Sequence, residues 1–166
     1  MNVRHFDPLA LLRRLQAHAV RFVVIGGLAA KAHGSPSLTV DLDLCHARDR
    51  GNLERLAAAL IELNARLRGA PADLPFRPDV ATLERGDHFT LVTDVGDLDI
   101  LGTPAGTAGF DDLDANAEDA DFGEGLTVRI ASLDDLIRMK RAAGRPKDRV
   151  ELEILGALRD EIGEGV

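Results

Sequence analysis

The 166-residue sequence predicts an α+β fold, a small mixed β-sheet flanked by helices, formed by one domain over residues 1–166. Three observations lead to this prediction. An apolar run near the N-terminus passes directly into a glycine turn and an Ala-rich segment, alternating apolar residues form a hairpin in mid-chain, and two helical patterns close the sequence. Strands that alternate with helices, with a hairpin among them, are typical of a sheet that carries helices on its surface.

The composition narrows the class of protein. Hydrophobic residues make up 45% of the chain but aromatic residues only 4%, so the core must be aliphatic and an aromatic platform for single-stranded nucleic acid is not expected. A formal net charge of −8 disfavours extended contact with phosphate backbones. The single Cys45, the absence of an apolar run of ~20 residues and an N-terminus without a signal-peptide pattern predict a cytoplasmic protein with no membrane partner.

The first half of the chain carries clear helix and strand signals. Asp7 followed by Pro8 predicts the N-cap and first position of a helix over 8–19. A buried strand is expected over 22–25, followed by a short helix that reaches residue 34 and a strand over 40–44. Leucines at steps of three and four predict that 52–67 is a helix that covers the sheet.

The middle of the chain is less regular. Segment 75–84 is ambiguous, with a short strand as one interpretation, whereas 88–93 and 97–101 alternate and flank a turn, which predicts a hairpin. Residues 102–125 contain seven acidic residues and no basic ones, which predicts a solvated loop with one helical turn near 111–120. A last strand is expected over 126–130.

Two helices are expected to close the chain. Ser132 is a capping residue for a helix that runs to Ala143 and ends at Gly144. Pro146 sits where the next helix begins, and the apolar face of that helix is predicted to consist of Val150, Ile154, Leu155, Leu158 and Ile162.

Two carboxylates stand out in the strand Val40-Asp41-Leu42-Asp43-Leu44. Because successive side chains of a strand point to opposite faces, Asp41 and Asp43 project together, and Val40, Leu42 and Leu44 share the other face. Two partly buried like charges need a cation to offset them, and carboxylate oxygens suit magnesium. The alternative interpretation is an exposed strand face that carries two charges.

The segment that leads to these carboxylates resembles a known family. A strand, then Gly26-Gly27, a short helix and Thr39-x-Asp41-x-Asp43 resemble the nucleotidyltransferase superfamily related to DNA polymerase beta, most nearly its AbiEii-type and minimal members. The resemblance implies that Gly26 and Gly27 touch nucleotide phosphates. It also implies that the two aspartates bind a pair of Mg²⁺ ions together with an NTP, such as ATP, as substrate.

The resemblance further implies a third carboxylate on a neighbouring strand, which completes the metal site and accepts a proton from the attacking hydroxyl. Asp97 and Asp99 share one face of their strand, so either could serve. The family pattern has the acidic residue directly before two apolar residues, and Asp99-Ile100-Leu101 fits it. We therefore choose Asp99 and interpret Asp97 as a turn residue.

The basic stretch 138–149 resembles the later AbiEii-type motifs, a lysine followed by an R-x-K-D-like element. By this resemblance Lys140 contacts the nucleotide phosphates and Asp148 holds or orients a site residue. The alternative is that both residues only complement helix dipoles. Relatives often carry an arginine where this chain has Ser37, which removes one contact to the triphosphate.

These observations predict a magnesium-dependent nucleotidyltransferase that transfers an NMP from an NTP to an acceptor hydroxyl, in the setting of a toxin–antitoxin system. The alternative is an inactive protein of the same fold that binds a protein partner, as an antitoxin does. A small molecule or a protein is favoured over a long nucleic acid as acceptor, while the end of a tRNA stays open. His33, His88 and Cys45 are assigned no role.

Overall fold

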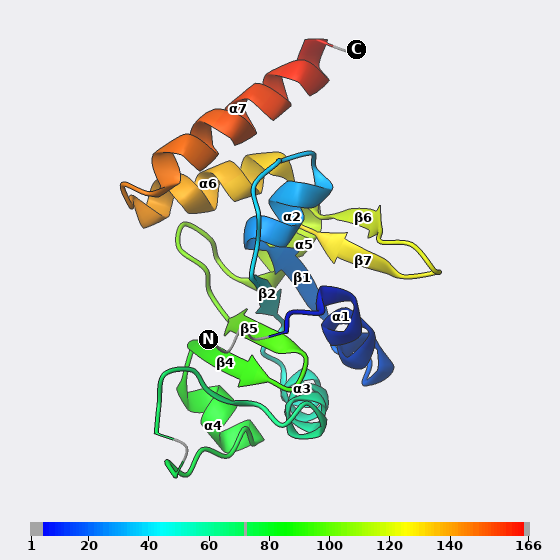
Figure 1. Cartoon of the computed structure of the whole chain (residues 1–166), viewed down its shortest axis with the longest axis vertical. Coiled ribbons are helices and arrows are strands. Elements are labelled where there is room, and N and C mark those ends of the chain that lie inside the picture. The colour runs from blue at the N-terminus through cyan, green and yellow to red at the C-terminus, as the bar shows by residue number, and fades with distance from the viewer. Residues whose placement is uncertain (1–4, 72, 165–166) are drawn as a thin grey trace.

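The computed structural model describes residues 5–71 and 73–164, and within them a seven-stranded mixed sheet carries helices (Figure 1). This confirms the predicted fold class. The strands are β1 (Phe22–Ile25), β2 (Asp41–His46), β3 (Arg66–Leu67), β4 (His88–Thr93), β5 (Gly96–Leu101), β6 (Glu118–Asp121) and β7 (Thr127–Ile130). The helices are α1 (Pro8–Ala17), α2 (Gly26–Ala32), α3 (Arg50–Glu62), α4 (Val80–Arg85), α5 (Phe110–Asn116), α6 (Leu133–Ala143) and α7 (Asp148–Glu164).

The strand order is β3-β4-β5-β2-β1-β7-β6. Strand β2 pairs antiparallel with β1 and parallel with β5, and β4 and β5 form the predicted antiparallel hairpin. All four residues of β1 are buried, as expected for a central strand that is covered on both faces. The parallel β2–β5 pair brings together two segments that are more than fifty residues apart in sequence.

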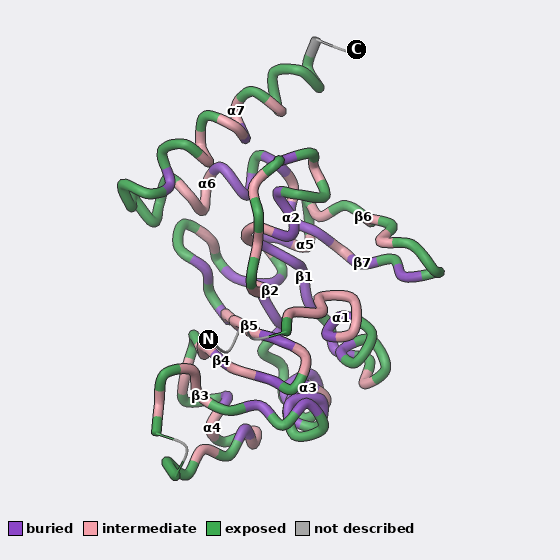
Figure 2. Tube along the Cα trace, in the orientation of Figure 1, coloured by how far each residue is buried: buried purple, intermediate pink, exposed green. Residues whose placement is uncertain are grey.

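Aliphatic side chains fill the core, and the leucines of α1, β2 and α3 include many of its largest fully buried members. Helix α2 contacts β1 and β2, and α1 contacts β2 and α3. In Figure 1, α3 and α4 lie at one end of the molecule and α6 and α7 at the other. The burial map shows a largely exposed α7, in contrast to β1, β2 and the inner face of α3 (Figure 2).

The helix caps follow the sequence signals. Asp7 Oδ1 accepts a hydrogen bond from Ala10 N at 3.0 Å, and Ser132 Oγ accepts one from Asp135 N at 3.1 Å. Gly144 has the left-handed conformation (φ 62°) expected of a C-terminal cap. Helix α1 ends at Ala17 and not at residue 19, because Ala19 is itself left-handed (φ 56°).

Helix α3 is shorter than the leucine spacing predicts. It ends at Glu62, and Asn64 adopts φ 54°, a conformation that asparagine tolerates better than most residues. The chain then turns back, so Leu67 lies in β3 and pairs with Leu91 of β4 instead of extending a helical face. The predicted helix over 52–67 was therefore wrong at its C-terminal end.

Two other segments differ from the prediction. Segment 75–84 holds no strand but the start of α4, whose N-cap Asp79 accepts a hydrogen bond from Thr82 N at 2.9 Å. The acidic segment 102–125 contains α5 and the edge strand β6, and not only a loop. Arg129 of β7 offsets this negative charge through ion pairs with Asp114 and Asp119.

Three residues of the predicted apolar faces are exposed. Val40 precedes β2 and does not share the buried face of Leu42 and Leu44, and Val150 and Ile162 lie on the outer side of α7. Helix α7 packs on α6 through the buried Leu155 and the partly buried Leu152 and Leu158, so its apolar face is narrower than the periodicity suggests. Across the described residues we find no helix long and apolar enough for a bilayer; the signal-peptide prediction concerns residues 1–4 in part, and these lie outside the described residues.

Candidate active site

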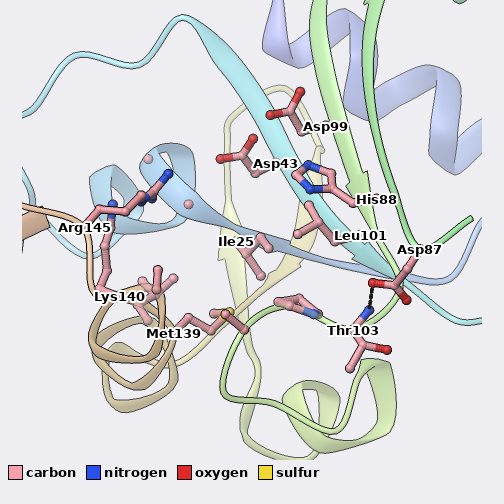
Figure 3. A pocket seen from close by; sticks show the side chains of 16 residues that line it. Ile25, Asp43, Asp87, His88, Asp99, Leu101, Thr103, Met139, Lys140 and Arg145 are labelled. Atoms are coloured by element: carbon pink, nitrogen blue, oxygen red, sulfur yellow. Dashed lines mark hydrogen bonds between the residues drawn. The ribbon is translucent and has the colours of Figure 1, made fainter. Parts of the chain in front are cut away.

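The carboxylates of β2 and β5 meet because these strands are parallel and in register. Asp41 lies opposite Asp97, and Asp43 lies opposite Asp99. One carboxylate oxygen each of Asp41, Asp43 and Asp99 lies within 4.8 Å of the other two. Figure 3 shows Asp43 and Asp99 side by side at one edge of a pocket. The structure thus brings Asp99 to Asp41 and Asp43, whereas Asp97 is not a member of this group.

The three carboxylates destabilise one another's charged forms. Burial, followed by the negative charges of Asp41 and Asp99, raises the pKa of Asp43 from its ordinary value of 3.8 to about 7. Burial and the charge of Asp99 also raise the pKa of Asp41. Moreover, Asp43 Oδ1 is buried and accepts no hydrogen bond from the described residues. The group therefore carries more negative charge than its surroundings compensate.

These features fit a divalent cation that prefers oxygen ligands. The donors are carboxylate oxygens from three residues and they converge, and Asp43 has a buried oxygen without a hydrogen-bond partner among the described residues. Magnesium has this ligand preference and commonly uses a small number of protein carboxylates together with substrate phosphates. The residues present are thus suited to the predicted metal.

An arginine that the sequence did not single out lies beside this group. Arg68 follows β3, and its Nη2 donates a hydrogen bond to Asp99 Oδ1 at 2.8 Å. Its Nε lies 3.2 Å from Asp97 Oδ2. Asp97 belongs to β5 and forms an ion pair with Arg68, so the interpretation of Asp97 as a turn residue was wrong.

The two glycines at the start of α2 lie against the carboxylate strand. Gly26 has φ 68°, and a Cβ atom there would lie 2.2 Å from Asp43 Oδ2. A Cβ atom on Gly27 would lie 2.9 Å from Thr39 Oγ1, the hydroxyl that donates a hydrogen bond to Asp41 O at 2.9 Å. Both glycines are therefore required by close packing against the aspartate segment, independently of any phosphate.

A basic wall lies on the other side of the pocket, whose volume is about 420 Å³. Lys140 of α6 and Arg145, from the loop that follows, both line the pocket, and both bind Asp148. Lys140 Nζ lies 3.1 Å from Asp148 Oδ1, and Arg145 Nε lies 2.8 Å from Asp148 Oδ2. Burial disfavours the charged form of Asp148, but these cations outweigh it and hold its pKa below the ordinary value.

The pocket brings together five of the predicted site residues: Gly26, Gly27, Asp43, Asp99 and Lys140. Asp41 joins through the carboxylate group but does not line the pocket, and Asp148 lies behind Lys140 and Arg145. Three further lining residues were not predicted from the sequence. Asp87, His88 and Thr103 lie across the pocket from Lys140 and Arg145 (Figure 3). His88 and its neighbour had no signal beyond their position at the start of a hairpin strand.

Arg145 and Arg68 were also missed as site residues. Arg145 stood in the recognised basic stretch, so its pairing with an acidic residue three positions later was the available signal. Arg68 had none, because its segment was predicted to be the end of a helix, and only the β3–β4–β5 order brings it to the carboxylates.

No protein-family model matches the sequence, and no curated protein sequence does. Among solved structures, the antibiotic-resistance factor ANT(2'')-Ia is 19% identical, with a TM-score of 0.58 over 95% of this chain and 85% of that one. TM1012 of Thermotoga maritima, assigned as a nucleotidyltransferase, is 17% identical, with a TM-score of 0.54 over 98% of both chains. At these identities the likeness concerns the fold, and a particular closeness to AbiEii-type proteins is not shown. The chain has the nucleotidyltransferase fold.

Proposed function

We propose that this protein is a magnesium-dependent nucleotidyltransferase that transfers an NMP from an NTP to an acceptor hydroxyl. One observation carries the proposal: three carboxylates converge within 4.8 Å at the edge of a pocket whose other side presents Lys140 and Arg145. An acidic group for metal opposite a basic wall for phosphate is the arrangement that phosphoryl-group transfer requires. The fold shared with nucleotidyltransferases supports the same reaction class.

Each residue then has a distinct task. Asp41, Asp43 and Asp99 would hold a pair of Mg²⁺ ions, which supply charge neutralisation and a lower pKa for the acceptor hydroxyl. Gly26 and Gly27 let the phosphates approach the backbone, and Lys140 neutralises charge on them, with Arg145 beside it. Asp148 holds the side chains of Lys140 and Arg145 in place through the hydrogen bonds described above.

The transfer is an in-line displacement at the α-phosphorus of the NTP. A bond forms between the acceptor oxygen and the α-phosphorus, the bond to the β-phosphate oxygen breaks, and pyrophosphate leaves. Asp99 accepts the proton of the acceptor hydroxyl. Because the attacking and leaving oxygens lie on opposite sides of the phosphorus, a pyrophosphate at Lys140 and Arg145 implies that the acceptor enters from the opposite wall, near His88 and Asp87.

The lost arginine at Ser37 motivates the alternative of an inactive, partner-binding protein. Arg145 argues against that alternative, because it adds a second cation to the phosphate wall beside Lys140. Retained carboxylates with an unpartnered buried oxygen argue against it as well, since a scaffold gains nothing from such a group. A role in a toxin–antitoxin pair remains a prediction, which growth assays with and without a co-expressed partner would test.

The acceptor is proposed to be a small molecule or a protein and not a long nucleic acid. The net charge of −8 offers little neutralisation of phosphates, so we expect no measurable binding of bulk tRNA at ~0.15 M salt. Tight binding that falls steeply with added salt, together with label on the tRNA 3′ end, would identify a tRNA end as acceptor instead.

The proposal is tested by incubating the protein with each α-labelled NTP, Mg²⁺ and cell extract, and by mass spectrometry of the labelled product. Isothermal titration calorimetry with a non-hydrolysable NTP should show binding that requires Mg²⁺. Asp43→Asn should lose both signals, whereas Asp160→Asn, which removes an exposed charge on α7, should keep them. If the wild-type protein binds no nucleotide at any Mg²⁺ concentration, the partner-binding alternative is favoured.

A further inference from the structure

Arg68 makes an unusual set of contacts for a residue that follows an edge strand. Its backbone N donates a hydrogen bond to Thr90 O at 2.9 Å, which continues the pairing of β3 with β4. Its side chain then crosses β4, where Nη2 donates to Leu91 O at 2.9 Å, and reaches Asp97 and Asp99 of β5. Only 22% of this side chain is exposed to solvent. The guanidinium is thus fixed by strand geometry as well as by charge.

The surroundings of the guanidinium are strongly acidic. Asp41, Asp43, Asp97 and Asp99 all project from the same face of the adjacent strands β2 and β5. Arg68 forms ion pairs with Asp97 and Asp99, the two members of this set that belong to β5. Its charge also lowers the pKa of Asp41, against the larger effect of burial.

We propose that Arg68 has two roles at this site. As a positioning residue, it holds one oxygen of Asp99 and so keeps the other available toward Asp43. As a resident cation, it opposes the binding of a divalent cation to the same carboxylates and thereby limits metal affinity before the nucleotide arrives. The effect on turnover rests on the proposed nucleotidyltransferase function, whereas the effect on metal affinity does not.

The two roles depend on different properties of the side chain, its positive charge and its planar hydrogen-bonding geometry. Lysine keeps the charge but lacks the planar fork that contacts Asp97, Asp99 and Leu91 O together. Methionine keeps much of the length and removes both the charge and the hydrogen bonds. The set Arg68→Lys and Arg68→Met therefore separates charge from positioning. Arg66→Met is the matched control, because Arg66 is an exposed arginine of β3, two residues before Arg68.

Metal affinity is measured first, by calorimetric titration of Mn²⁺ into protein without nucleotide. Arg68→Met should bind Mn²⁺ about three- to tenfold more tightly than wild type, because a positive charge has been removed beside the carboxylates. Arg68→Lys and Arg66→Met should stay near the wild-type affinity. In an Asp99→Asn background the gain from Arg68→Met should shrink, since the shared carboxylate is gone. Unchanged or weaker Mn²⁺ binding by Arg68→Met overturns the resident-cation role.

Turnover is measured next with the labelled NTP. Arg68→Met and Arg68→Lys should both lower kcat at least about tenfold with little change in the KM for the NTP, because the proton acceptor Asp99 is misplaced while the phosphate wall is intact. Full recovery of kcat in Arg68→Lys overturns the positioning role. If Arg68→Met fails to fold, Arg68→Gln replaces it in both assays with the same expected results. If wild type shows no transfer, the proposed function fails, and the Mn²⁺ titrations still decide the resident-cation role.

Discussion

Asp43 and Asp148 are two aspartates on opposite sides of one pocket, and their environments shift their pKa values in opposite directions. At Asp43, burial and two neighbouring carboxylates raise the pKa to about 7. At Asp148, of which only 2% is exposed to solvent, hydrogen bonds from Arg145 and Lys140 outweigh the effect of burial and keep the pKa below its ordinary value. The two aspartates differ in their partners, because carboxylates lie beside Asp43 and cations lie beside Asp148.

The two aspartates also differ in whether their carboxylate oxygens have hydrogen-bond partners. Both oxygens of Asp148 accept hydrogen bonds from cations of its own chain, so Asp148 holds Lys140 and Arg145 of the basic wall in place. Asp43 has a buried oxygen without a hydrogen-bond partner, so it gains from a cation added from outside. Charge-removing substitutions should therefore act in opposite ways at the two positions.

The largest expected effect is on catalysis by Asp41→Asn and Asp43→Asn. Residues that only orient metal ligands contribute about 10- to 100-fold, so loss of a ligand itself should reduce turnover by more than about 100-fold. Both variants should stay folded, and Asp43→Asn should raise metal-free stability at pH 8 by on the order of 1 kcal/mol, because one repelled charge is gone. Activity assays paired with urea unfolding measure both. Near-normal transfer by either variant contradicts the metal-site assignment.

The second prediction compares the two aspartates of β5. Asp99→Asn should lower turnover about as strongly as Asp43→Asn, whereas Asp97→Asn should lower it less than about tenfold, since Asp97 lies outside the converging group and acts through Arg68. Kinetics of the two variants in parallel test the order. The reverse order would make Asp97 the third site carboxylate, and two mild variants would remove β5 from the mechanism.

The third prediction is the opposite stability effect at Asp148. Asp148→Asn removes hydrogen bonds to two charged groups, which should lower the free energy of unfolding by about 1–3 kcal/mol, while partial solvent exposure of Lys140 and Arg145 limits the loss. The Mg²⁺-dependent binding of a non-hydrolysable NTP should weaken as well. Asp134→Asn, on the exposed side of α6, is the control. A stability gain at Asp148→Asn would mean that the triad with Lys140 and Arg145 costs more than it contributes.

The smallest effect is the pH dependence of stability without metal. The pKa of Asp43 is higher in the folded protein than in the unfolded chain, so its contribution is present below about pH 4 and is lost as the pH rises through about 7. The contribution of Asp148, with a lowered folded pKa, is present above its unfolded value and is lost as the pH falls.

Unfolding curves between pH 4 and 8 for wild type and Asp43→Asn should therefore diverge as the pH rises, with the variant the more stable at the upper end. Saturating Mg²⁺ should reduce this divergence, because the metal ion offsets the repulsion that the variant removes. Parallel curves across the whole range would show that Asp43 is not strained in the folded protein.

The sequence predicted the local structure of the site correctly wherever neighbours in the chain decide it. Alternation in β2 fixed the common face of Asp41 and Asp43, and the caps of α6 fixed the place of Lys140 in its last turn. The prediction failed where a long-range pairing outweighed a local pattern. Leucine spacing favoured a helix through Leu67, but a left-handed Asn64 and the pairing of β3 with β4 turned that segment into a strand.

What the sequence by itself determined was therefore the set of elements and the pair of carboxylates on one strand face, because both depend on the two- and 3.6-residue periods of the backbone. The residues of β5 left Asp97 and Asp99 open, and only the family resemblance favoured Asp99. The tertiary structure brought Asp99 to the group and decided which arginine stands beside it. The parallel register of β2 and β5 puts Asp99 opposite Asp43, and the strand order carries Arg68 across β4 to Asp97 and Asp99. Strand order arises from packing between segments far apart in the chain, so the alternation within a strand fixes which face is buried but not which strand lies beside it.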